Sequence, residues 1–276
     1  MPTLYLVATP IGNLEDVSLR GLRVLREVSL IAAENTRTAR KLLSHYGIKA
    51  RLTSYTEHNK RAKIPLLLKA LEQGDVALVS EAGMPAISDP GGDLVQAAAE
   101  AGHTVVAVPG PSAVITALAV SGLPTRQFTY LGFLPRRSGE RRRLLALLAG
   151  ESRTIVAFES PHRLRETLAD LLSALGDRRI AVCRELTKLY EEVFRGMVSE
   201  ALAHFEAPRG EFTLVIEGAS DSAQAAPDEA SLREDLLRLR AAGKSAREAT
   251  AEVAKRYGLS RREVYRVWVG LDAPLS

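Results

Sequence analysis

The amino-acid sequence predicts an α/β protein of two units followed by a small all-α module. Short runs rich in β-branched residues alternate with segments of helical period, which is typical of α/β folds with largely parallel sheets. Two breaks in composition separate the parts, and serine–glutamate helix starts mark the last one. Strands are expected at residues 3–8, 76–80, 104–108, 128–133, 154–158, 180–184 and 212–217, and helices at 17–28, 60–73, 94–101, 112–121 and 164–175.

The composition breaks also give the domain boundaries. Glycine, proline and arginine gather around residues 122–143, as expected of a hinge, and small polar residues fill 219–227, as expected of a linker. We therefore expect an N-terminal α/β domain at 1–121, a second α/β domain at 122–219, a linker at 220–229 and a helix-turn-helix module at 230–276.

The helical module carries three Ser-x-x-Glu capping boxes, which begin at Ser231, Ser245 and Ser260. In such a box the serine accepts from a free amide of the first turn, and the glutamate reaches back to the serine amide. A helix, a glycine turn and a second capped helix form the helix-turn-helix pattern. The second helix carries Arg261, Arg262 and Arg266, which we expect to contact RNA phosphates. A packing module with solvated arginines is the alternative.

The overall composition is that of a globular protein in a reducing compartment. The net charge of +4 is only weak support for nucleic-acid binding. The single cysteine, Cys183, lies in an apolar run and is interpreted as a buried, inert thiol. The first residues lack the basic segment of a signal peptide, and no apolar stretch reaches the length of about 20 residues that spans a bilayer. We expect a cytoplasmic protein.

Three strands end in turns that contain glycine and proline, at residues 8–13, 80–91 and 109–112. Ligands of α/β proteins bind beyond the carboxyl ends of strands, where glycine permits close approach and helix-start amides supply donors. These turns predict a structured pocket for a small molecule.

Several common site motifs are missing from the sequence. It contains no Gly-x-Gly-x-x-Gly after a strand, no nucleotide P-loop and no Gly-x-Ser-x-Gly elbow. The five histidines show no spacing of paired metal ligands, so no metal site is expected. The pocket is predicted to hold a ligand other than NAD or ATP.

The densest charge cluster lies beside the aromatic residue Phe133. A positive groove with stacking side chains is typical of single-stranded RNA binding, whereas a solvated helix face is the alternative. Arg163, which opens a predicted helix, is a further candidate for phosphate. The arginines of the cluster are Arg136, Arg137, Arg141, Arg142 and Arg143.

A series of motifs resembles one family in order and content. They are Thr9–Leu14 with the sequence TPIGNL, Glu34-Asn35-Thr36-Arg37, SYTEHN at 54–59, the loop at 81–91, PGPSA at 109–113, GFLP at 132–135, ESPHR at 159–163 and RELTK at 184–188. This chain resembles the ribosomal RNA small subunit methyltransferase I family, of the tetrapyrrole-methylase-like superfamily. The resemblance covers about residues 3–218, and the C-terminal module resembles that family's helix-turn-helix tail.

The resemblance implies a two-domain methylase, usually a homodimer, with S-adenosylmethionine in the cleft that the second domain closes. It also implies methyl transfer to the ribose 2′-hydroxyl of a decoding-centre cytidine in 16S ribosomal RNA of the 30S subunit. The residues that would bind the cofactor by motif position are Pro10, Gly12, Ser80, Glu81, Gly83, Met84, Ile87, Ser112, Ala113, Phe158, Leu186 and Thr187.

The chain departs from the family pattern in two places. The pattern usually reads Asp-Thr-Arg and Asp-Ala-Gly-Thr-Pro, where this chain has Asn35-Thr36-Arg37 and Glu81-Ala82-Gly83-Met84-Pro85. Glu81 keeps the charge on a longer side chain, whereas Asn35 loses a carboxylate.

The matched motifs also contain candidates for a general base. The histidine side chain in general needs the least adjustment for proton transfer near neutral pH, so His58 is the first candidate, and Glu159 is the second. Glu57 and Lys188 have suitable chemistry, and alignment of the reactants without any base is the alternative.

Two functions of other classes compete with RNA methylation. A small-molecule methylase acting on a tetrapyrrole precursor fits the cofactor turns but has no use for the arginine cluster or the tail. A non-catalytic RNA-binding protein fits the tail but not the intact cofactor turns.

Overall fold

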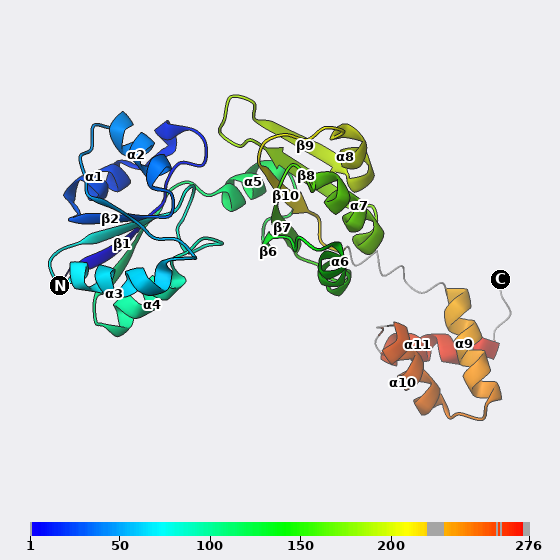
Figure 1. Cartoon of the computed structure of the whole chain (residues 1–276). Helices are drawn as coiled ribbons and strands as arrows, with labels where there is room; N and C mark the ends of the chain where they lie inside the picture. Colours follow the sequence, from blue (N-terminus) through cyan, green and yellow to red (C-terminus); the bar gives the residue numbers. More distant parts are fainter. Residues whose placement is uncertain (1, 220–228, 258, 260, 273–276) are drawn as a thin grey trace. The chain divides into compact units, whose positions relative to one another are not determined.

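The computed structural model describes residues 2–219, 229–257, 259 and 261–272 (Figure 1). The chain forms two compact units, Met1–Gly218 and Ala219–Ser276. The first unit contains two five-stranded sheets, and the second unit is helical. None of the helices in the described part of the chain is long and apolar enough to cross a membrane.

The first sheet is parallel throughout and has the strand order β3-β2-β4-β1-β5. Alternate residues of its central strands enter two different cores, because successive side chains of a strand point to opposite faces. Ala77 and Val79 pack under α1 and α2, whereas Val76 and Leu78 pack under α3 and α4. Its elements are β1 (Thr3–Val7), η1 (Leu14–Asp16), α1 (Leu19–Glu27), β2 (Leu30–Ala33), α2 (Thr36–His45), β3 (Leu52–Ser54), α3 (Lys60–Leu71), β4 (Val76–Val79), α4 (Gly92–Glu100) and β5 (Thr104–Val108).

The second sheet is mixed and has the order β6-β7-β10-β8-β9. Helix α5 covers one face, and α6, α7 and α8 cover the other. Its elements are α5 (Ala113–Ser121), β6 (Phe128–Phe133), α6 (Ser138–Leu147), β7 (Thr154–Glu159), α7 (Leu164–Leu175), β8 (Arg179–Arg184), β9 (Glu192–Met197), α8 (Val198–His204) and β10 (Phe212–Ile216).

The predicted α/β fold class is confirmed, but the prediction of largely parallel sheets is wrong for this second sheet. Only β6 and β7 run parallel there; the pairs β7–β10, β10–β8 and β8–β9 are antiparallel. The loop of residues 185–191 joins β8 directly to β9, and strands joined without a crossover must run in opposite directions.

Cys183 lies on β8 within the core beneath α5 and is 1% exposed. Burial raises the pKa of its thiol to about 12, so the thiol is protonated at neutral pH. The interpretation of Cys183 as a buried, inert thiol is confirmed.

The C-terminal unit consists of α9 (Glu229–Ala241), α10 (Ala246–Tyr257), α11 (Arg261–Val269) and the short η2 (Gly270–Asp272). Leu236, Val253 and Val264 are buried at its centre. The second capping box is confirmed: Ser245 N donates to Glu248 Oε2 at 3.0 Å, and Glu248 N donates to Ser245 Oγ at 3.4 Å. The first box is misplaced because α9 begins before Ser231, and Ser260 of the third lies outside the described residues.

Candidate functional site

A cavity of about 880 Å³ lies at the carboxyl ends of the strands of the first sheet and is bounded on the other side by residues of the second sheet. This volume falls in the range of pockets for small molecules and cofactors, roughly 300–1,000 Å³. Apolar side chains make much of its wall, and among them Ile87, Ile115 and Phe133 are each more than half exposed. Phe158 packs its ring against Tyr130 and Phe133 at centroid distances of 5.5 and 5.4 Å.

Two of the turns at the cavity are joined by their backbones. Thr9 N donates to Gly83 O, and Gly83 N donates to Thr9 O, both at 2.9 Å. Gly83 has a φ of +81°, a conformation that favours glycine. At Gly110, an added Cβ would meet the Ala8 Cβ at 3.0 Å. The glycines therefore allow the three turns to approach one another around the cavity.

The loop from Glu81 to Gly91 holds an unusual backbone against the second sheet. Ala86 and Ser88 have φ values of +70° and +63°, which are costly for residues with a Cβ. The hydroxyl oxygens of Ser88 and Tyr130 are 2.7 Å apart, so a hydrogen bond ties this loop to β6. Such strain persists only where surrounding contacts over-determine the conformation, and it is common at ligand sites.

One side of the cavity is acidic, with Glu34, Glu81 and Asp89 close together. Burial, together with the charges of Glu34 and Glu81, raises the pKa of Asp89 to about 6, against the opposing effect of a hydrogen bond from Ser80. Among the described residues that line the cavity, none is a lysine, arginine or histidine. The wall is thus suited to a ligand with positive charge.

The two departures from the family pattern meet in this wall. Asn35 Nδ2 donates to Glu81 Oε1 at 3.0 Å, and Thr38 Oγ1 donates to the same oxygen at 3.2 Å. Asn35 Oδ1 meanwhile caps α2 by accepting from the amides of Arg37 and Thr38. An aspartate at position 35 could make the cap but not the donation, so the amide at 35 and the longer carboxylate at 81 fit each other.

Seven of the twelve cofactor candidates line the cavity and five do not. The lining set is Glu81, Gly83, Met84, Ile87, Ser112, Ala113 and Phe158. The residues outside the lining are Pro10, Gly12, Ser80, Leu186 and Thr187.

Gly12 and the loop that contains Leu186 and Thr187 fasten the two sheets together beside the cavity. Asn13 N donates to Thr187 Oγ1 at 3.0 Å, and a Cβ on Gly12 would lie 2.5 Å from Lys188 Cγ. Side chains at position 12 would therefore push the two loops apart. These residues hold the two loops together and are absent from the described lining of the cavity.

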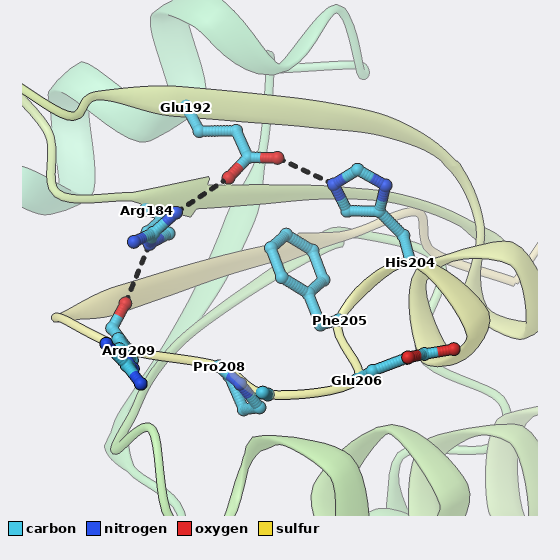
Figure 2. Close-up of a pocket in the computed structure, with 8 residues that line it drawn as sticks. Arg184, Glu192, His204, Phe205, Glu206, Pro208 and Arg209 are labelled. Carbon is cyan, nitrogen blue, oxygen red and sulfur yellow. Dashed lines mark hydrogen bonds and ion pairs between the residues drawn. The ribbon is translucent and has the colours of Figure 1, made fainter.

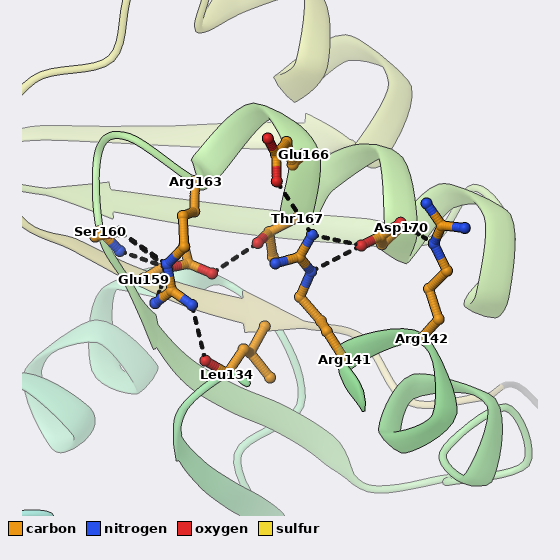
Figure 3. A network of polar contacts seen from close by, with 9 residues as sticks. All are labelled: Leu134, Arg141, Arg142, Glu159, Ser160, Arg163, Glu166, Thr167 and Asp170. Atoms are coloured by element: carbon orange, nitrogen blue, oxygen red, sulfur yellow. Dashed lines mark hydrogen bonds and ion pairs between the residues drawn. The ribbon is translucent and has the colours of Figure 1, made fainter. Parts of the chain in front are cut away.

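Glu159 lies at the end of β7, lines the cavity and is 1% exposed (Figure 3). Its Oε1 accepts from Ser160 N at 2.7 Å and pairs with Arg163 at 2.6 Å, and its Oε2 accepts from Thr167 at 2.6 Å. Arg163 also donates to Leu134 O at 3.0 Å. Both carboxylate oxygens of Glu159 already accept hydrogen bonds or pair with Arg163. Glu159 therefore stabilises the cavity wall and is a poor candidate for a general base.

His58 lies in the turn before α3, is exposed, and is absent from the cavity lining. The structure therefore does not bring the first candidate for the base to the cavity. The sequence reasoning missed Glu34, Asp89 and Tyr130. Glu34 and Asp89 both stand in segments that the motifs contained. Glu34 follows β2, a strand of four residues that the hydrophobic pattern did not reveal.

The arginine cluster is divided by the structure. Arg141 is 1% exposed and pairs with Asp170, donating from Nε at 2.7 Å (Figure 3), so its prediction as an RNA contact is corrected to a structural role. Asp170 also accepts from Arg142 Nε at 2.8 Å, which fastens α6 to α7. Arg163 is 18% exposed and held by Glu159. The remaining arginines of the prediction are exposed: Arg136, Arg137, Arg142 and Arg143 at α6, and Arg261, Arg262 and Arg266 on α11.

A second cavity, of about 170 Å³, lies beside α8 (Figure 2). Glu192 bridges its two sides, with its oxygens 2.6 Å from His204 Nε2 and 3.1 Å from Arg184 Nη1, and Arg184 Nε donates to Arg209 O. The hydrogen bond with His204 lowers the pKa of Glu192. These charged groups satisfy one another, and the volume is below the usual range for ligands, so the larger cavity is the candidate site.

Comparison with protein families matches residues 3–202 to the Tetrapyrrole (Corrin/Porphyrin) Methylases. A ribosomal RNA small subunit methyltransferase I of Halalkalibacterium halodurans is 46% identical over 274 residues, covering 96% of this chain and 94% of that protein. The protein of the same name from Thermotoga maritima is 52% identical over 221 residues, covering 79% of this chain and 99% of that protein. The latter match is close in length to the first unit, Met1–Gly218.

Solved structures share the fold at low identity. A cobalamin biosynthetic enzyme, cobalt precorrin-4 methyltransferase, matches with a TM-score of 0.58 and 17% identity over 78% of this chain and 94% of that chain. Uroporphyrin-III-C-methyltransferase from Thermus thermophilus matches with a TM-score of 0.55 and 24% identity, over 79% and 94% of the two chains.

We predict that Asn35→Asp destabilises the protein by about 1 kcal/mol at pH 8, because it replaces a donor to Glu81 by a second carboxylate. Aspartate caps helices as well as asparagine does, so the cap of α2 is retained. Urea unfolding measures the change. The double variant Asn35→Asp/Glu81→Gln restores one donor and one acceptor and should recover most of the loss. Equal stability of the wild type and Asn35→Asp at pH 8 would contradict this role of the pair.

We also predict that Asp170→Ala lowers the free energy of unfolding by about 3–5 kcal/mol, because it leaves the buried Arg141 with only the 3.5 Å contact to Glu166. Removing both charges, in Arg141→Met/Asp170→Ala, should cost much less than the single change. Thermal and urea unfolding of the three proteins provide the comparison. If the double variant is no more stable than Asp170→Ala, the ion pair is not what fastens α6.

Proposed function

The chain belongs to the tetrapyrrole methylase family, and from this premise we propose that it is an S-adenosylmethionine-dependent enzyme that methylates a ribose 2′-hydroxyl of a decoding-centre cytidine in 16S ribosomal RNA. Its relatives at 46% and 52% identity are named ribosomal RNA small subunit methyltransferase I. The observation that carries the proposal is the 880 Å³ cavity, which combines an acidic wall with apolar and aromatic sides.

The cavity suits S-adenosylmethionine in charge and shape. The cofactor supplies an electrophilic methyl group on a sulfonium cation, and Glu34, Glu81 and Asp89 offer that cation a negative environment. The start of α5 also lines the cavity, and its first amides are suited to a carboxylate. Phe158 and its aromatic neighbours offer flat apolar surfaces for a purine ring.

An acidic cavity also restricts which part of an RNA can enter it. A phosphate would meet several carboxylates and no basic side chain among the described lining residues, whereas a ribose hydroxyl is neutral. We propose that arginines outside the cavity bind the phosphates. The Arg142–Asp170 contact fastens helix α6, which carries one group of these arginines, and the arginines of α11 lie in the C-terminal unit.

We propose that the C-terminal unit is an RNA-docking module. The described residues that line the cavity belong to the first unit. The relative from Thermotoga maritima is covered to 99% by a match of 221 residues, about the length of that unit. We further propose that the protein acts in the cytoplasm as a homodimer on the 30S subunit.

Catalysis in this site rests chiefly on alignment. The acceptor oxygen, the methyl carbon and the sulfur must lie on one line, and positioning of this kind lowers barriers by several kcal/mol. Two features keep the cavity walls in place: the Thr9–Gly83 backbone pair and the Ser88–Tyr130 hydrogen bond.

We predict that the purified protein transfers a radiolabelled methyl group from S-adenosylmethionine to 30S subunits taken from cells that lack the enzyme. Mapping of the labelled nucleotide should identify a cytidine carrying a ribose methyl group at the decoding centre. Subunits from wild-type cells serve as the control, because their site is already modified. Label on a base, or transfer to a tetrapyrrole precursor but not to RNA, would reject the proposed function.

We predict that the triple change Arg261→Ala/Arg262→Ala/Arg266→Ala weakens RNA binding and flattens its dependence on salt. Each lost phosphate contact should reduce the logarithmic slope by about 0.7 for single-stranded RNA. The matched control is Arg20→Ala/Arg26→Ala/Arg40→Ala, which removes three exposed arginines of α1 and α2. Binding measured between 50 and 300 mM salt (roughly the range where counterion release is resolved) distinguishes the two. The same slope in both variants would show that α11 makes no phosphate contacts.

A further inference from the structure

Among the residues that the structure describes, five carboxylates line the cavity, and they differ in the groups that they already contact. Glu159 is held by Arg163, Ser160 and Thr167, and Glu211 is paired with Lys188 at 2.9 Å. A carboxylate that is paired with a cation must give up that interaction to take a proton, which makes it a weak acceptor.

The acidic wall shows the same contrast. Glu81 accepts from Asn35 and Thr38, and Glu34 accepts from the backbone amide of Glu81 at 3.1 Å. Among the described residues, Ser80 favours the ionised form of Asp89, whereas the negative charges of Glu34 and Glu81 oppose it. Of the five, Asp89 is the carboxylate with the most to gain from accepting a proton.

The surroundings of Asp89 also determine when it is ionised. The groups that face it are Glu34 at the end of β2, Ser80 at the end of β4, Glu81 in its own loop and Tyr130 on β6. Burial is the largest effect and raises its pKa to about 6, and burial likewise raises the pKa of Tyr130. Asp89 is therefore mostly ionised at pH 7 to 8, yet more basic than an ordinary aspartate, which is the property that a general base requires.

The loop fixes where the Asp89 carboxylate lies. Its neighbour Ser88 has a φ of +63° and shares a hydrogen bond with Tyr130, so the residue before Asp89 is fastened to the second sheet. Gly91, with a φ of +158°, packs so closely against Ala86 and Leu78 that an added Cβ would approach both at 2.9 Å. Asp89 is thus held between two constrained residues on the cavity wall.

We propose, on the basis of the proposed function, that Asp89 is the general base that accepts the proton of the ribose 2′-hydroxyl during methyl transfer. The oxygen–methyl bond forms with an electron pair of the hydroxyl oxygen while the methyl–sulfur bond breaks, and its electron pair stays on sulfur. The hydroxyl proton passes to the Asp89 carboxylate. The products are the methyl ether, the neutral thioether of S-adenosylhomocysteine and a protonated Asp89, which returns its proton to solvent.

The first test reads Asp89 directly, in the full-length protein without cofactor or RNA. Carboxyl carbons labelled with ¹³C at aspartate are titrated by NMR in the wild type, in Asp89→Asn and in the control Asp16→Asn, an exposed aspartate outside the lining. One resonance should titrate with a midpoint near the pKa of about 6 and vanish only in Asp89→Asn. Absence of such a resonance, or its survival in Asp89→Asn, overturns the inference.

The second test is single-turnover methylation of 30S subunits between pH 5.5 and 8.5. The wild-type rate should rise with pH and then level off, with its midpoint at or below that of the free protein, because a bound sulfonium favours the ionised carboxylate. At saturating cofactor, Asp89→Asn should be slower by about 10²- to 10⁴-fold, without this midpoint. Calorimetry measures cofactor affinity separately, because the loss of one wall carboxylate also weakens binding of the sulfonium. Asp89→Glu should retain the midpoint.

An Asp89→Asn rate within tenfold of the wild type, or an unchanged pH profile, would show that Asp89 is not the base.

A stability measurement tests whether the Asp89→Asn variant is folded. Because the pKa of Asp89 is higher in the folded than in the unfolded chain, its contribution to stability falls as pH rises from about 4 to 6. Asp89→Asn should therefore melt above the wild type at pH 7.5, with a smaller difference at pH 4.5. The carboxyl titration does not involve RNA, so it decides on Asp89 even if 30S subunits prove not to be the acceptor.

Discussion

The pair of backbone hydrogen bonds between Thr9 and Gly83 is the contact on which the site depends. It joins the turn after β1 to the turn after β4, and only a residue that tolerates a φ of +81° can stand at position 83. With these turns joined, the rest of the Glu81–Gly91 loop is directed toward the second sheet, where Ser88 meets Tyr130. Backbone hydrogen bonds therefore set the position of the cavity wall, and the side chains of the loop then line it.

The partners of each carboxylate divide the acidic residues of the site by role. Glu159 is buried with a guanidinium, a hydroxyl and an amide, and it stabilises the wall. Glu81 is oriented by Asn35 and Thr38. Asp89, which lacks a cationic partner among the described lining residues, has a raised pKa. The same side-chain chemistry thus serves packing, orientation and proton transfer according to what surrounds it.

The surroundings of each arginine determine its role in the same way. Arg141 and Arg142 are neighbours on α6, but Arg141 points into the protein and is buried against Asp170, whereas the side chain of Arg142 is 67% exposed. A buried pair of this kind keeps a helix at a defined place because either charge alone would be costly. The exposed arginines of α6 consequently project from a fixed helix, which suits the proposed binding of RNA phosphates outside an acidic cavity.

The sequence by itself determined the α/β class, most strands of both sheets and the position of the pocket, because hydrophobic period and glycine–proline turns are local signals. It missed β2, β3 and β9, which are short or polar and are stabilised as strands by their neighbours in the sheet. It also assigned RNA binding to Arg141, which is buried, and chose as the first candidate for the base His58, which is absent from the described lining of the cavity. Burial and pairing depend on residues distant in the chain, as Asp170 is from Arg141 and as Glu34 is from Asp89. Only the tertiary structure could therefore decide which charged groups are engaged and which are available for chemistry.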